Sequence, residues 1–585
     1  MTPTTDTHVL LRALVDELAR CGMRAACTAP GSRSAPLALS LVREPRLRCY
    51  SHVDERCAGF FALGLAKASG LPVAVTCTSG TAAAELLPAA IEAREARVPL
   101  LLLTADRPAE LRESGAGQAI DQLKLYGSAA KWFFEVELPP GADEAALRWI
   151  RTLACRAYWT ALEGRPGAVH LNFPLREPLL GEREPPEDPS GRPGRAPFVR
   201  RAPARPEAHA AQPELRELLA GSRRGVLVAG RHERPGALGP AAAELARAAG
   251  WPLLADPLSG ARRGEHAVAH YDALLRVPGL VGSLAPDLVL RVGDLPVSKP
   301  LRAWLAGLTG VPQAALDPEG AWQDPDGVLT HSFALEPAAA LTGLAATHAS
   351  AAEPEWAGSW RSADERAAQA IGGALAGSGL SEPAVAAELG ALLPAESTLF
   401  VASSMPVRDI ESFWPARADP PRVLCNRGAN GIDGIVSSAF GAAAASDGPV
   451  VLLIGDVALA HDLGGLLAAR RLGLKLTIVL LDNGGGGIFD FLEVARSPLT
   501  SGGPGFYEGH IATPTGLDFA AAAALYGLSY ERPEDRRGFR AALERALGGA
   551  GGSQSSILEV HGERDANVAL HARIWEAVAA SARAT

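Results

Sequence analysis

Short runs of β-branched residues or leucine alternate with longer segments rich in Ala, Leu, Glu and Arg along most of the chain. Two such runs are residues 73–77 and 450–454, and each of them is followed by a helical segment. Continuous apolar strands of this length, alternating with helices, are typical of parallel sheets that are covered on both faces. The pattern therefore predicts an α/β fold of doubly wound parallel sheets.

Two polar stretches divide the 585 residues, one rich in Pro and Arg at 182–213 and a weaker one at 346–360. They predict three α/β domains. Their expected bounds are an N-terminal domain over 1–185, a linker over 186–213, a central domain over 214–345, a linker with a first helix over 346–380, and a C-terminal domain over 381–585. Ligands of such folds bind beyond the carboxyl ends of the strands, so functional residues are expected there.

Composition excludes several classes of protein. Hydrophobic residues make up 48% and charged residues 21%, which rules out a collagen, a coiled coil and a wholly disordered chain. The net charge is −9 and no basic block stands out, which argues against a nucleic-acid partner. No apolar run approaches the ~20 residues that span a bilayer. The seven cysteines form no CxxC pair. We therefore expect a soluble cytoplasmic protein with reduced thiols and no membrane insertion.

Polar residues follow two apolar strands of the third block. Gly455 and Asp456 come after residues 450–454, while Asn483 comes after 476–481 and opens a run of four glycines. A carboxylate, a carboxamide and a flexible backbone carbonyl form a hard-oxygen set suited to Mg²⁺. Glycines let the backbone approach an anion closely. Taken singly, each motif would read as a polar strand cap or a loose loop, but together at matched strand ends they favour a metal and phosphate site.

The order and spacing of these residues resemble the GD…N signature of the thiamine-diphosphate-dependent enzymes. The resemblance implies thiamine diphosphate together with Mg²⁺ or Mn²⁺ as cofactors. The metal ligands would be Asp456, Asn483 and the backbone carbonyl of Gly485. Many members of the family carry a second Asn where this chain has Gly484.

The same resemblance assigns the activating carboxylate to Glu55, in the segment SHVDER. Taken alone, Glu55 would read as a solvated acid at the start of a helix. In this superfamily the domain with the glutamate faces the diphosphate domain of another subunit. The resemblance therefore implies a homo-oligomer, a dimer or a tetramer, with active sites at subunit interfaces.

Several segments narrow the resemblance to the branch of the family that serves menaquinone biosynthesis: PGSRSAPL, TADR, GAGQAI, SSMPVR and NRGANGIDG. That branch decarboxylates 2-oxoglutarate and adds the succinyl-semialdehyde carbanion to isochorismate. Both substrates are dianions, and guanidinium groups bind carboxylates through paired hydrogen bonds. By resemblance, Ser404, Arg408 and Arg427 serve the succinyl side. Ser32, Arg33, Arg107 and Gln118 serve isochorismate, with Lys299 nearby, followed by Pro300 where the family usually has Arg.

The resemblance also implies a set of further cofactor-binding residues. Some belong to the turn TSGT near the aminopyrimidine, others to the diphosphate strand end or to the apolar pocket wall. They are Ser79, Gly80, Thr81, Ile432, Gly455, Ile488, Phe489 and Leu492. By residue type alone, the apolar members would be assigned to the core.

Two alternatives stay open at this point. One is another thiamine-diphosphate carboligase or decarboxylase of a small 2-oxo acid, which would not need the arginine set. The other is a non-catalytic protein that keeps only the thiamine fold. The retention of Glu55, Asp456 and Asn483 argues against the second alternative.

Overall fold

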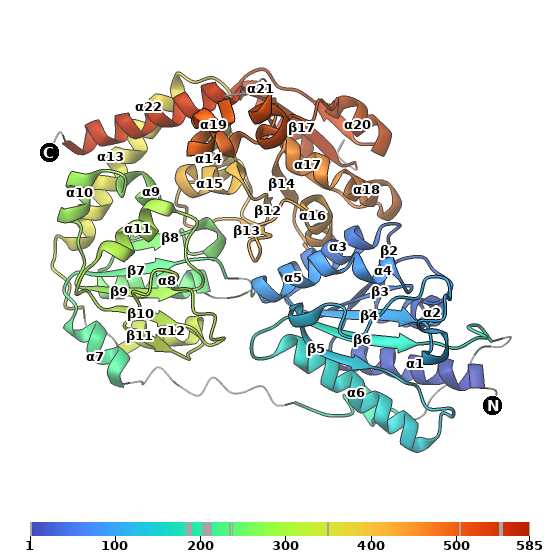
Figure 1. The fold of residues 1–585 in the computed structure, drawn as a ribbon. Coiled ribbons are helices and arrows are strands. Elements are labelled where there is room, and N and C mark those ends of the chain that lie inside the picture. Colours follow the sequence, from blue (N-terminus) through green and yellow to red (C-terminus); the bar gives the residue numbers. More distant parts are fainter. Residues whose placement is uncertain are drawn as a thin grey trace. The chain divides into compact units, whose positions relative to one another are not determined.

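Three parallel β-sheets with flanking helices make up the computed structural model (Figure 1). It describes residues 3–181, 184, 190–201, 213–232, 234, 236, 238–347, 350–501, 505–548 and 554–583. The predicted α/β fold of parallel sheets is confirmed. Much of the predicted linker 186–213 lies outside the described residues, since 186–189 and 202–212 are not among them.

The chain groups into two compact units, and each is described by itself. The first consists of Met1–Pro203, Asn426–Ser446 and His461–Lys475. The second consists of Ala204–Cys425, Asp447–Ala460 and Leu476–Thr585. Two segments of the predicted C-terminal domain therefore group with the N-terminal part of the chain.

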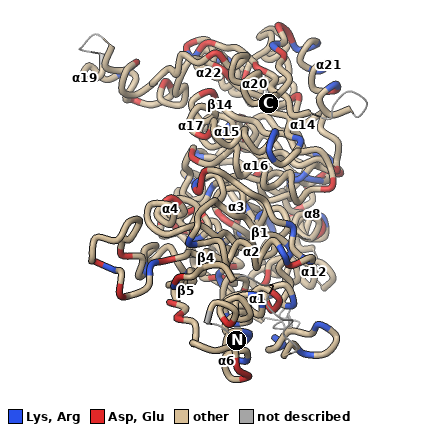
Figure 2. Tube along the Cα trace, turned by 90° about the vertical axis from the view of Figure 1, so that its right-hand side faces the viewer, with Lys and Arg blue, Asp and Glu red and all other residues tan. Residues whose placement is uncertain are grey.

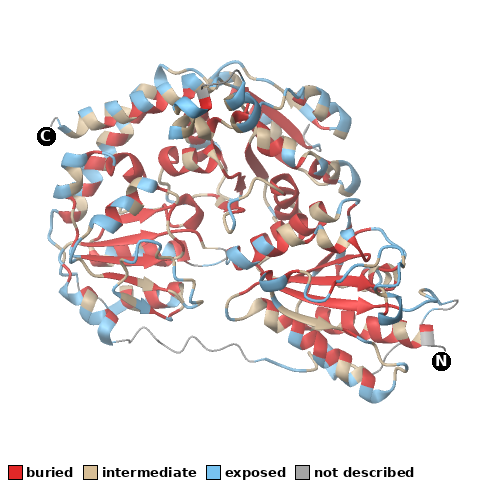
Figure 3. Ribbon diagram, in the orientation of Figure 1, coloured by how far each residue is buried: buried red, intermediate tan, exposed pale blue. Residues whose placement is uncertain are grey.

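The first unit contains a six-stranded sheet with the order β2-β1-β3-β4-β6-β5. Its strands are β1 Ala25–Thr28, β2 Arg48–Ser51, β3 Val73–Cys77, β4 Leu100–Asp106, β5 Ala130–Glu135 and β6 Ala168–Pro174. Its helices are α1 Pro3–Cys21, α2 Ala35–Val42, α3 Glu55–Ser69, α4 Thr81–Ala84, α5 Leu87–Ala96, α6 Glu144–Leu162, α16 Ile435–Ala444 and α18 Leu467–Leu472. The strands β3, β4 and β6 are buried along their whole length (Figure 3), as their continuous apolar runs predict.

The second unit contains a five-stranded sheet with the order β11-β10-β9-β7-β8. Its strands are β7 Gly225–Ala229, β8 Leu253–Ala255, β9 Leu288–Val292, β10 Gln313–Leu316 and β11 His331–Phe333. The helices of this part are α7 Pro213–Gly221, α8 Leu238–Ala249, α9 Tyr271–Leu274, α10 Pro278–Ser283, α11 Lys299–Gly307, α12 Pro337–Thr347 and α13 Trp356–Ala376.

A further six-stranded sheet in the second unit has the order β13-β12-β14-β15-β17-β16. Its strands are β12 Thr398–Val401, β13 Arg422–Cys425, β14 Val450–Gly455, β15 Thr477–Asp482, β16 Ser529–Glu531 and β17 Ser556–His561. The remaining helices are α14 Glu382–Leu392, α15 Met405–Phe413, α17 Asp456–His461, α19 Pro498–Ser501, α20 Phe519–Tyr526, α21 Arg536–Leu547 and α22 Arg564–Arg583.

The two six-stranded sheets follow the same order of strands, and in both the chain changes direction across the sheet after its second strand. This topological switch lies between β1 and β3 in one sheet and between β12 and β14 in the other. Doubly wound folds bind ligands just beyond the strand ends at such a switch. The predicted segments PGSRSAPL, TSGT, SSMPVR and GD follow these four strands directly.

Figure 2 shows acidic and basic residues interspersed along the trace. All seven cysteines are free thiols, as predicted, and six of them are buried. Among the described residues, none of the helices combines the length and the apolar character that a membrane crossing requires.

Helices α3 and α16 pack backbone against backbone in the first unit. A Cβ added to Gly64 would lie 1.9 Å from the carbonyl oxygen of Ser438, and one added to Gly441 would lie 2.0 Å from that of Phe61. Ser438 Oγ also donates to the carbonyl of Phe60 at 3.0 Å. Two reciprocal glycines therefore set the approach of the two helices.

We expect Gly64→Ala to destabilise the protein by about 2 kcal/mol, because the added methyl group meets backbone that cannot give way. Gly372→Ala is the matched control, since Gly372 lies in α13 with open space around its missing Cβ. There we expect a gain of about 0.5–1 kcal/mol from helix propensity. Scanning calorimetry of both variants measures the shifts, and an unchanged melting temperature for Gly64→Ala would contradict the packing described.

Candidate active site

Glu55 is the first residue of α3 in the first unit. The preceding Asp54 caps the helix by accepting a hydrogen bond from the backbone N–H of Cys57 at 3.1 Å. Glu55 itself is half-buried. Burial raises the pKa of Glu55, and the negative charges of Asp54 and Glu85 add to the effect. The predicted activator is thus a carboxyl group that gives up its proton less readily than an ordinary glutamate.

The turn TSGT after β3 is held by a glutamine that the sequence did not single out. Gly80, with φ of 89°, caps α4 and donates its N–H to Gln122 Oε1 at 2.9 Å. Gln122 Nε2 donates in turn to Asn172 Oδ1 at 2.9 Å and to the carbonyl of Ala105 at 3.1 Å. The buried Ser79 Oγ has no hydrogen-bond partner in the described part of the chain. Gln122 therefore fixes the turn, while Ser79 keeps a polar group available there.

Two predicted arginines lie near each other in the first unit. Arg33 is buried and donates to the carbonyl of Leu175 at 2.7 Å and to Glu177 Oε1 at 2.9 Å. Burial lowers the pKa of Arg33, and the positive charge of Arg107 lowers it further. Arg107 donates through Nε and Nη2 to the carbonyl of Gly117, at 3.0 and 2.8 Å. Glu177 compensates one of these two positive charges, and the remaining one is available to an anion.

The other predicted residues of the first unit are more exposed. Ser32 is exposed next to Arg33, and Gln118 is exposed with φ of 55° directly after Gly117. Arg427 and Ile432 are half-buried in the loop 426–434, which precedes α16. The structure thus places Gln118 in the loop to which Arg107 is bonded.

In the second unit, Asp456 begins α17 directly after β14 and is 2% exposed. Burial, together with the charge of Asp482, raises the pKa of Asp456 to about 6, even though the N–H groups of Val457 and Gly485 act in the opposite direction. Among the described residues, Asp456 Oδ2 and Asn483 Oδ1 are buried without a hydrogen-bond partner. Two buried, unpaired hard oxygens at neighbouring strand ends fit a divalent cation.

The glycine run gives the loop after β15 its close approach to the chain opposite. Gly485 has φ of 138°, and a Cβ there would lie 2.7 Å from the carbonyl oxygen of Ala512. Gly484 has φ of 73° but open space around it. The loop therefore demands glycine at 485, whereas an Asn would fit sterically at 484, where the family often has one.

Glu382 in α14 is a residue that the sequence reading missed. Its Oε1 accepts a hydrogen bond from Asn483 Nδ2 at 2.8 Å, which turns the other side of the amide, Oδ1, toward the unpaired position. Burial raises the pKa of Glu382 to about 7, with a contribution from the charge of Asp409. In sequence, Glu382 looks like an ordinary acid in the first turn of a helix, so no local signal could have identified it.

A cavity of about 260 Å³ in the second unit brings together four predicted residues, Lys299, Arg408, Ile488 and Leu492. Its other lining residues include Asp272, Ser298, Asp409, Ser412, Phe491 and His571. Arg408 Nη1 donates to the carbonyl of Ser404 at 2.5 Å, and Ser404 precedes α15 with φ of 76°. Phe489 is half-buried in the neighbouring short helix Gly487–Phe491, and Phe491 rather than Phe489 lines the cavity.

Asp272 ties the two cationic sides of this cavity to each other. Its Oδ1 accepts from Ser298 Oγ at 2.6 Å, and its Oδ2 accepts from Ser412 Oγ at 2.9 Å. Ser298 caps the helix α11 that starts with Lys299, and Ser412 lies in α15 with Arg408. The buried carboxylate of Asp272 thus sets the position of one cation relative to the other. The three partners are too far apart in sequence for this to be predicted.

Behind Arg408, the buried Asp409 pairs with His571. His571 Nε2 lies 3.0 Å from Asp409 Oδ1, and its Nδ1 lies 2.9 Å from the carbonyl of Asn567. Burial by itself lowers the pKa of His571, but the contact with Asp409 outweighs it and the net shift is upward. Burial raises the pKa of Asp409 as well. Asp409 and His571 therefore form a hydrogen-bonded pair in the lining of the cavity.

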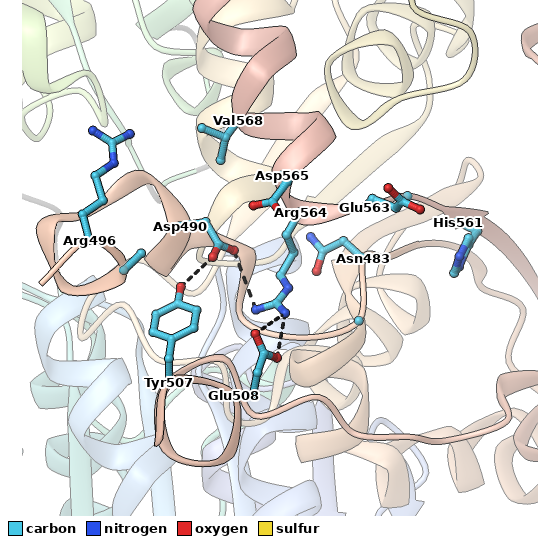
Figure 4. A pocket seen from close by; sticks show the side chains of 13 residues that line it. Asn483, Asp490, Arg496, Tyr507, Glu508, His561, Glu563, Arg564, Asp565 and Val568 are labelled. Atoms are coloured by element: carbon cyan, nitrogen blue, oxygen red, sulfur yellow. Dashed lines mark hydrogen bonds and ion pairs between the residues drawn. The ribbon is translucent and has the colours of Figure 1, made fainter. Parts of the chain in front are cut away.

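A larger cavity of about 750 Å³ adjoins Asn483 and Gly484 (Figure 4). Arg564 lies between two acids there: its Nη2 donates to both carboxylate oxygens of Glu508, at 2.8 and 2.7 Å, and its Nη1 is 3.8 Å from Asp490. Tyr507 donates its hydroxyl to Asp490 at 2.6 Å. The charge of Arg564 is thus compensated by the carboxylates of Glu508 and Asp490.

Three family models match the chain in succession. "Thiamine pyrophosphate enzyme, N-terminal TPP binding domain" matches residues 9–125, and "Middle domain of thiamine pyrophosphate" matches residues 193–401. "Thiamine pyrophosphate enzyme, C-terminal TPP binding domain" matches residues 409–560. Thiamine pyrophosphate is another name for thiamine diphosphate, so the matches confirm that cofactor.

Curated relatives match nearly end to end. The 2-succinyl-5-enolpyruvyl-6-hydroxy-3-cyclohexene-1-carboxylate synthase of Geobacillus kaustophilus is 46% identical over 579 residues, covering 98% of both chains. Its counterpart from Chloroflexus aurantiacus is 42% identical over 580 residues, covering 97% of this chain and 95% of the relative. That of Listeria innocua is 40% identical over 591 residues, covering 98% of both. With this identity over almost the whole length and all three thiamine-pyrophosphate domains in order, the chain belongs to the family of thiamine-diphosphate-dependent 2-succinyl-5-enolpyruvyl-6-hydroxy-3-cyclohexene-1-carboxylate synthases.

Proposed function

We propose that this enzyme forms a carbon–carbon bond between 2-oxoglutarate and isochorismate, with loss of CO₂, in menaquinone biosynthesis. The product is 2-succinyl-5-enolpyruvyl-6-hydroxy-3-cyclohexene-1-carboxylate, the compound in the relatives' name. The observation that carries the proposal is the cavity in which Arg408 and Lys299 stand together with the apolar Ile488 and Leu492. Cations beside an apolar wall suit a substrate that combines carboxylates with a carbon chain.

Thiamine diphosphate supplies the reactive carbon centre that decarboxylates a 2-oxo acid and transfers the remaining fragment. The first unit contributes Glu55, whose raised pKa suits it to share a proton with the aminopyrimidine ring. Gln122 keeps the turn with Ser79, Gly80 and Thr81 in shape to receive that ring.

We infer that Asp456, Asn483 and the carbonyl of Gly485 hold Mg²⁺ or Mn²⁺ on the diphosphate. The buried, unpaired oxygens of Asp456 and Asn483 support this assignment. Glu382 then acts behind the metal by orienting the amide of Asn483.

Each substrate has its own set of polar residues in this proposal. Arg408, Arg427 and Ser404 bind the succinyl side, and the N-terminal end of the nine-residue helix α15, which contains Arg408, also favours an anion. Ser32, Arg33, Arg107 and Gln118 bind isochorismate, with Lys299 nearby. The apolar Ile488, Phe489 and Leu492 exclude water from the reacting carbons.

The proposed assembly is a homodimer or homotetramer in which each active site takes Glu55 from one subunit and Asp456 from another. A cytoplasmic setting belongs to the same proposal, and the seven free thiols are consistent with it.

Glu55→Gln removes the carboxyl group and keeps the shape of the side chain. We expect kcat to fall by about 10²–10⁴-fold, the range for a lost general acid–base group, while the melting temperature stays unchanged. Glu85→Gln is the control, because Glu85 is an exposed neighbour and should keep most of the activity. Steady-state product formation measures both, and wild-type kcat in Glu55→Gln would exclude the proposed role.

The shared active site can be tested by mixing two inactive variants. Glu55→Gln and Asp456→Asn, once their subunits have exchanged at equal concentration, should recover about a quarter of the wild-type activity, since half the dimers are mixed and each has one intact site. Native mass spectrometry verifies the exchange. Complete exchange without recovery would show that both residues act within one subunit.

Arg408→Ala should lower kcat/KM for 2-oxoglutarate by roughly 30-fold, the equivalent of about 2 kcal/mol for a lost charged hydrogen-bonding group. Arg408→Lys keeps the charge but loses the planar fork, and should be intermediate. Initial rates against each substrate measure the effect. An unchanged kcat/KM for 2-oxoglutarate in Arg408→Ala would favour the alternative, a carboligase of small 2-oxo acids.

Glu382→Ala should weaken Mg²⁺ binding about 10–100-fold, because Asn483 then loses the partner that orients it. Glu382→Gln is the matched control, since its Oε1 still accepts the same hydrogen bond. A Mg²⁺ titration of the thermal shift produced by thiamine diphosphate measures the affinity. Equal affinities in the wild type and Glu382→Ala would refute the supporting role of Glu382. No shift with wild-type protein would favour the non-catalytic alternative.

A further inference from the structure

One carboxylate fastens the backbone of the loop that carries Arg427. Glu92, in α5, accepts the N–H of Gly428 through Oε1 at 2.9 Å and the N–H of Ala429 through Oε2 at 2.7 Å. Two successive backbone donors thus meet the two oxygens of a single side chain. Charge-assisted hydrogen bonds of this length are roughly twice as strong as neutral ones and fix the loop's orientation.

The burial of Glu92 is compensated by one of the five lysines in the chain. Glu92 is 3% exposed and Lys67, in α3, is 1% exposed. Lys67 Nζ lies 3.7 Å from Glu92 Oε1. Burying a carboxylate is costly unless a cation and hydrogen-bond donors compensate for the lost water. Lys67 therefore supplies the countercharge for the carboxylate that holds the loop.

The loop lies directly against α5 at this point. A Cβ added to Gly428 would be 2.6 Å from the backbone N of Ala96 and 2.9 Å from the carbonyl oxygen of Glu92. Only glycine permits that approach, so the sequence NRGANG has glycine where the carboxylate of Glu92 comes closest.

The residues on both sides of Arg427 are held by hydrogen bonds. On one side, Asn426 Nδ2 donates to Ser438 Oγ at 2.9 Å, and Ser438 Oγ donates to the carbonyl of Phe60 at 3.0 Å. On the other side is the Glu92 contact with Gly428. Beyond it, Ala429 and Asn430 are exposed, and Asn430 has φ of 65°. The direction in which Arg427 projects is thus set by the residues on either side of it.

We propose that Glu92, paired with Lys67, is a positioning residue that orients Arg427 toward a substrate carboxylate. This inference rests on the proposed function, in which Arg427 serves the succinyl side. A buried ion pair could also act only as a structural link between α3 and α5, and the experiment separates the two roles.

The test replaces the pair by neutral residues of similar size, Glu92→Gln together with Lys67→Met, so that no buried charge is left alone. We expect KM for 2-oxoglutarate to rise about 10-fold, while KM for isochorismate changes less than about two-fold. In an Arg427→Ala background the same pair of substitutions should leave KM for 2-oxoglutarate unchanged, because the residue being aimed is gone. Glu95→Gln, on the exposed face of α5, is the matched control and should resemble the wild type.

A lowered melting temperature with an unchanged KM for 2-oxoglutarate, or an equal change with and without Arg427, would overturn the positioning role. Should the double variant fail to fold, Glu92→Asp carries the same test, since it keeps the charge but withdraws both oxygens from the loop.

Hydrogen exchange of residues 426–434 gives a readout that needs no activity. Faster exchange at Gly428 and Ala429 in the neutral variant is expected, and unchanged exchange would show that Glu92 does not hold the loop. If the wild type instead fails to consume 2-oxoglutarate, the proposed function is wrong, while the exchange result still decides the contact itself.

Discussion

The C-terminal sheet of this enzyme presents two oxygen atoms that folding buries without a hydrogen-bond partner. Asp456 Oδ2 and Asn483 Oδ1 have no hydrogen-bond donor in the described part of the chain. An unsatisfied buried acceptor costs about 1–3 kcal/mol. The fold maintains these atoms because the parallel strands β14 and β15 end at the same edge, which fixes Asp456 and Asn483 side by side. The backbone N–H of Gly485 forms a hydrogen bond with Asp456. Glu382 accepts a hydrogen bond from the side-chain amide of Asn483.

The same logic of strand ends governs the first unit. Its six-stranded sheet repeats the strand order of the diphosphate-binding sheet, so its switch point also exposes two strand ends. Here the loops after β1 and β3 contain Arg33 and the TSGT turn, whereas Asp456 and Asn483 follow strands of the other sheet. The two sheets thus share one strand order and differ in the side chains that their strand-end loops present.

The sequence predicted the strands and the motifs, which depend on neighbouring residues, but not the contacts between residues that are far apart in the chain. Apolar runs predicted parallel strands because a strand buried on both faces leaves no polar position. Motifs such as GD or NRGANGIDG predicted site residues because the functional group and its glycines are neighbours in the chain. Which domain bounds apply remains a prediction, since segments 426–446 and 461–475 group with the N-terminal part.

The residues that support the site were not predictable in this way. Gln122, Asp272 and Glu382 contact the partners described above at separations of 17 to 140 positions, and each is an ordinary polar residue in its own segment. Their importance arises only when the fold brings a buried acceptor or donor to the right backbone group. A single sequence contains no local pattern for such contacts.

Whether an arginine is paired with a carboxylate cannot be predicted from its residue type. Arg107 and Arg112 are five positions apart in one loop, and composition cannot tell them apart. Arg112 donates to Asp106 and Glu135, which cancel its charge. Arg107 donates to the carbonyl of Gly117, which orients the guanidinium but leaves its charge in place. Arg408 is oriented in a comparable way by the carbonyl of Ser404. In a chain with a net charge of −9, the orientation of an arginine by a backbone carbonyl is thus a property of the folded loops and not of the arginine count.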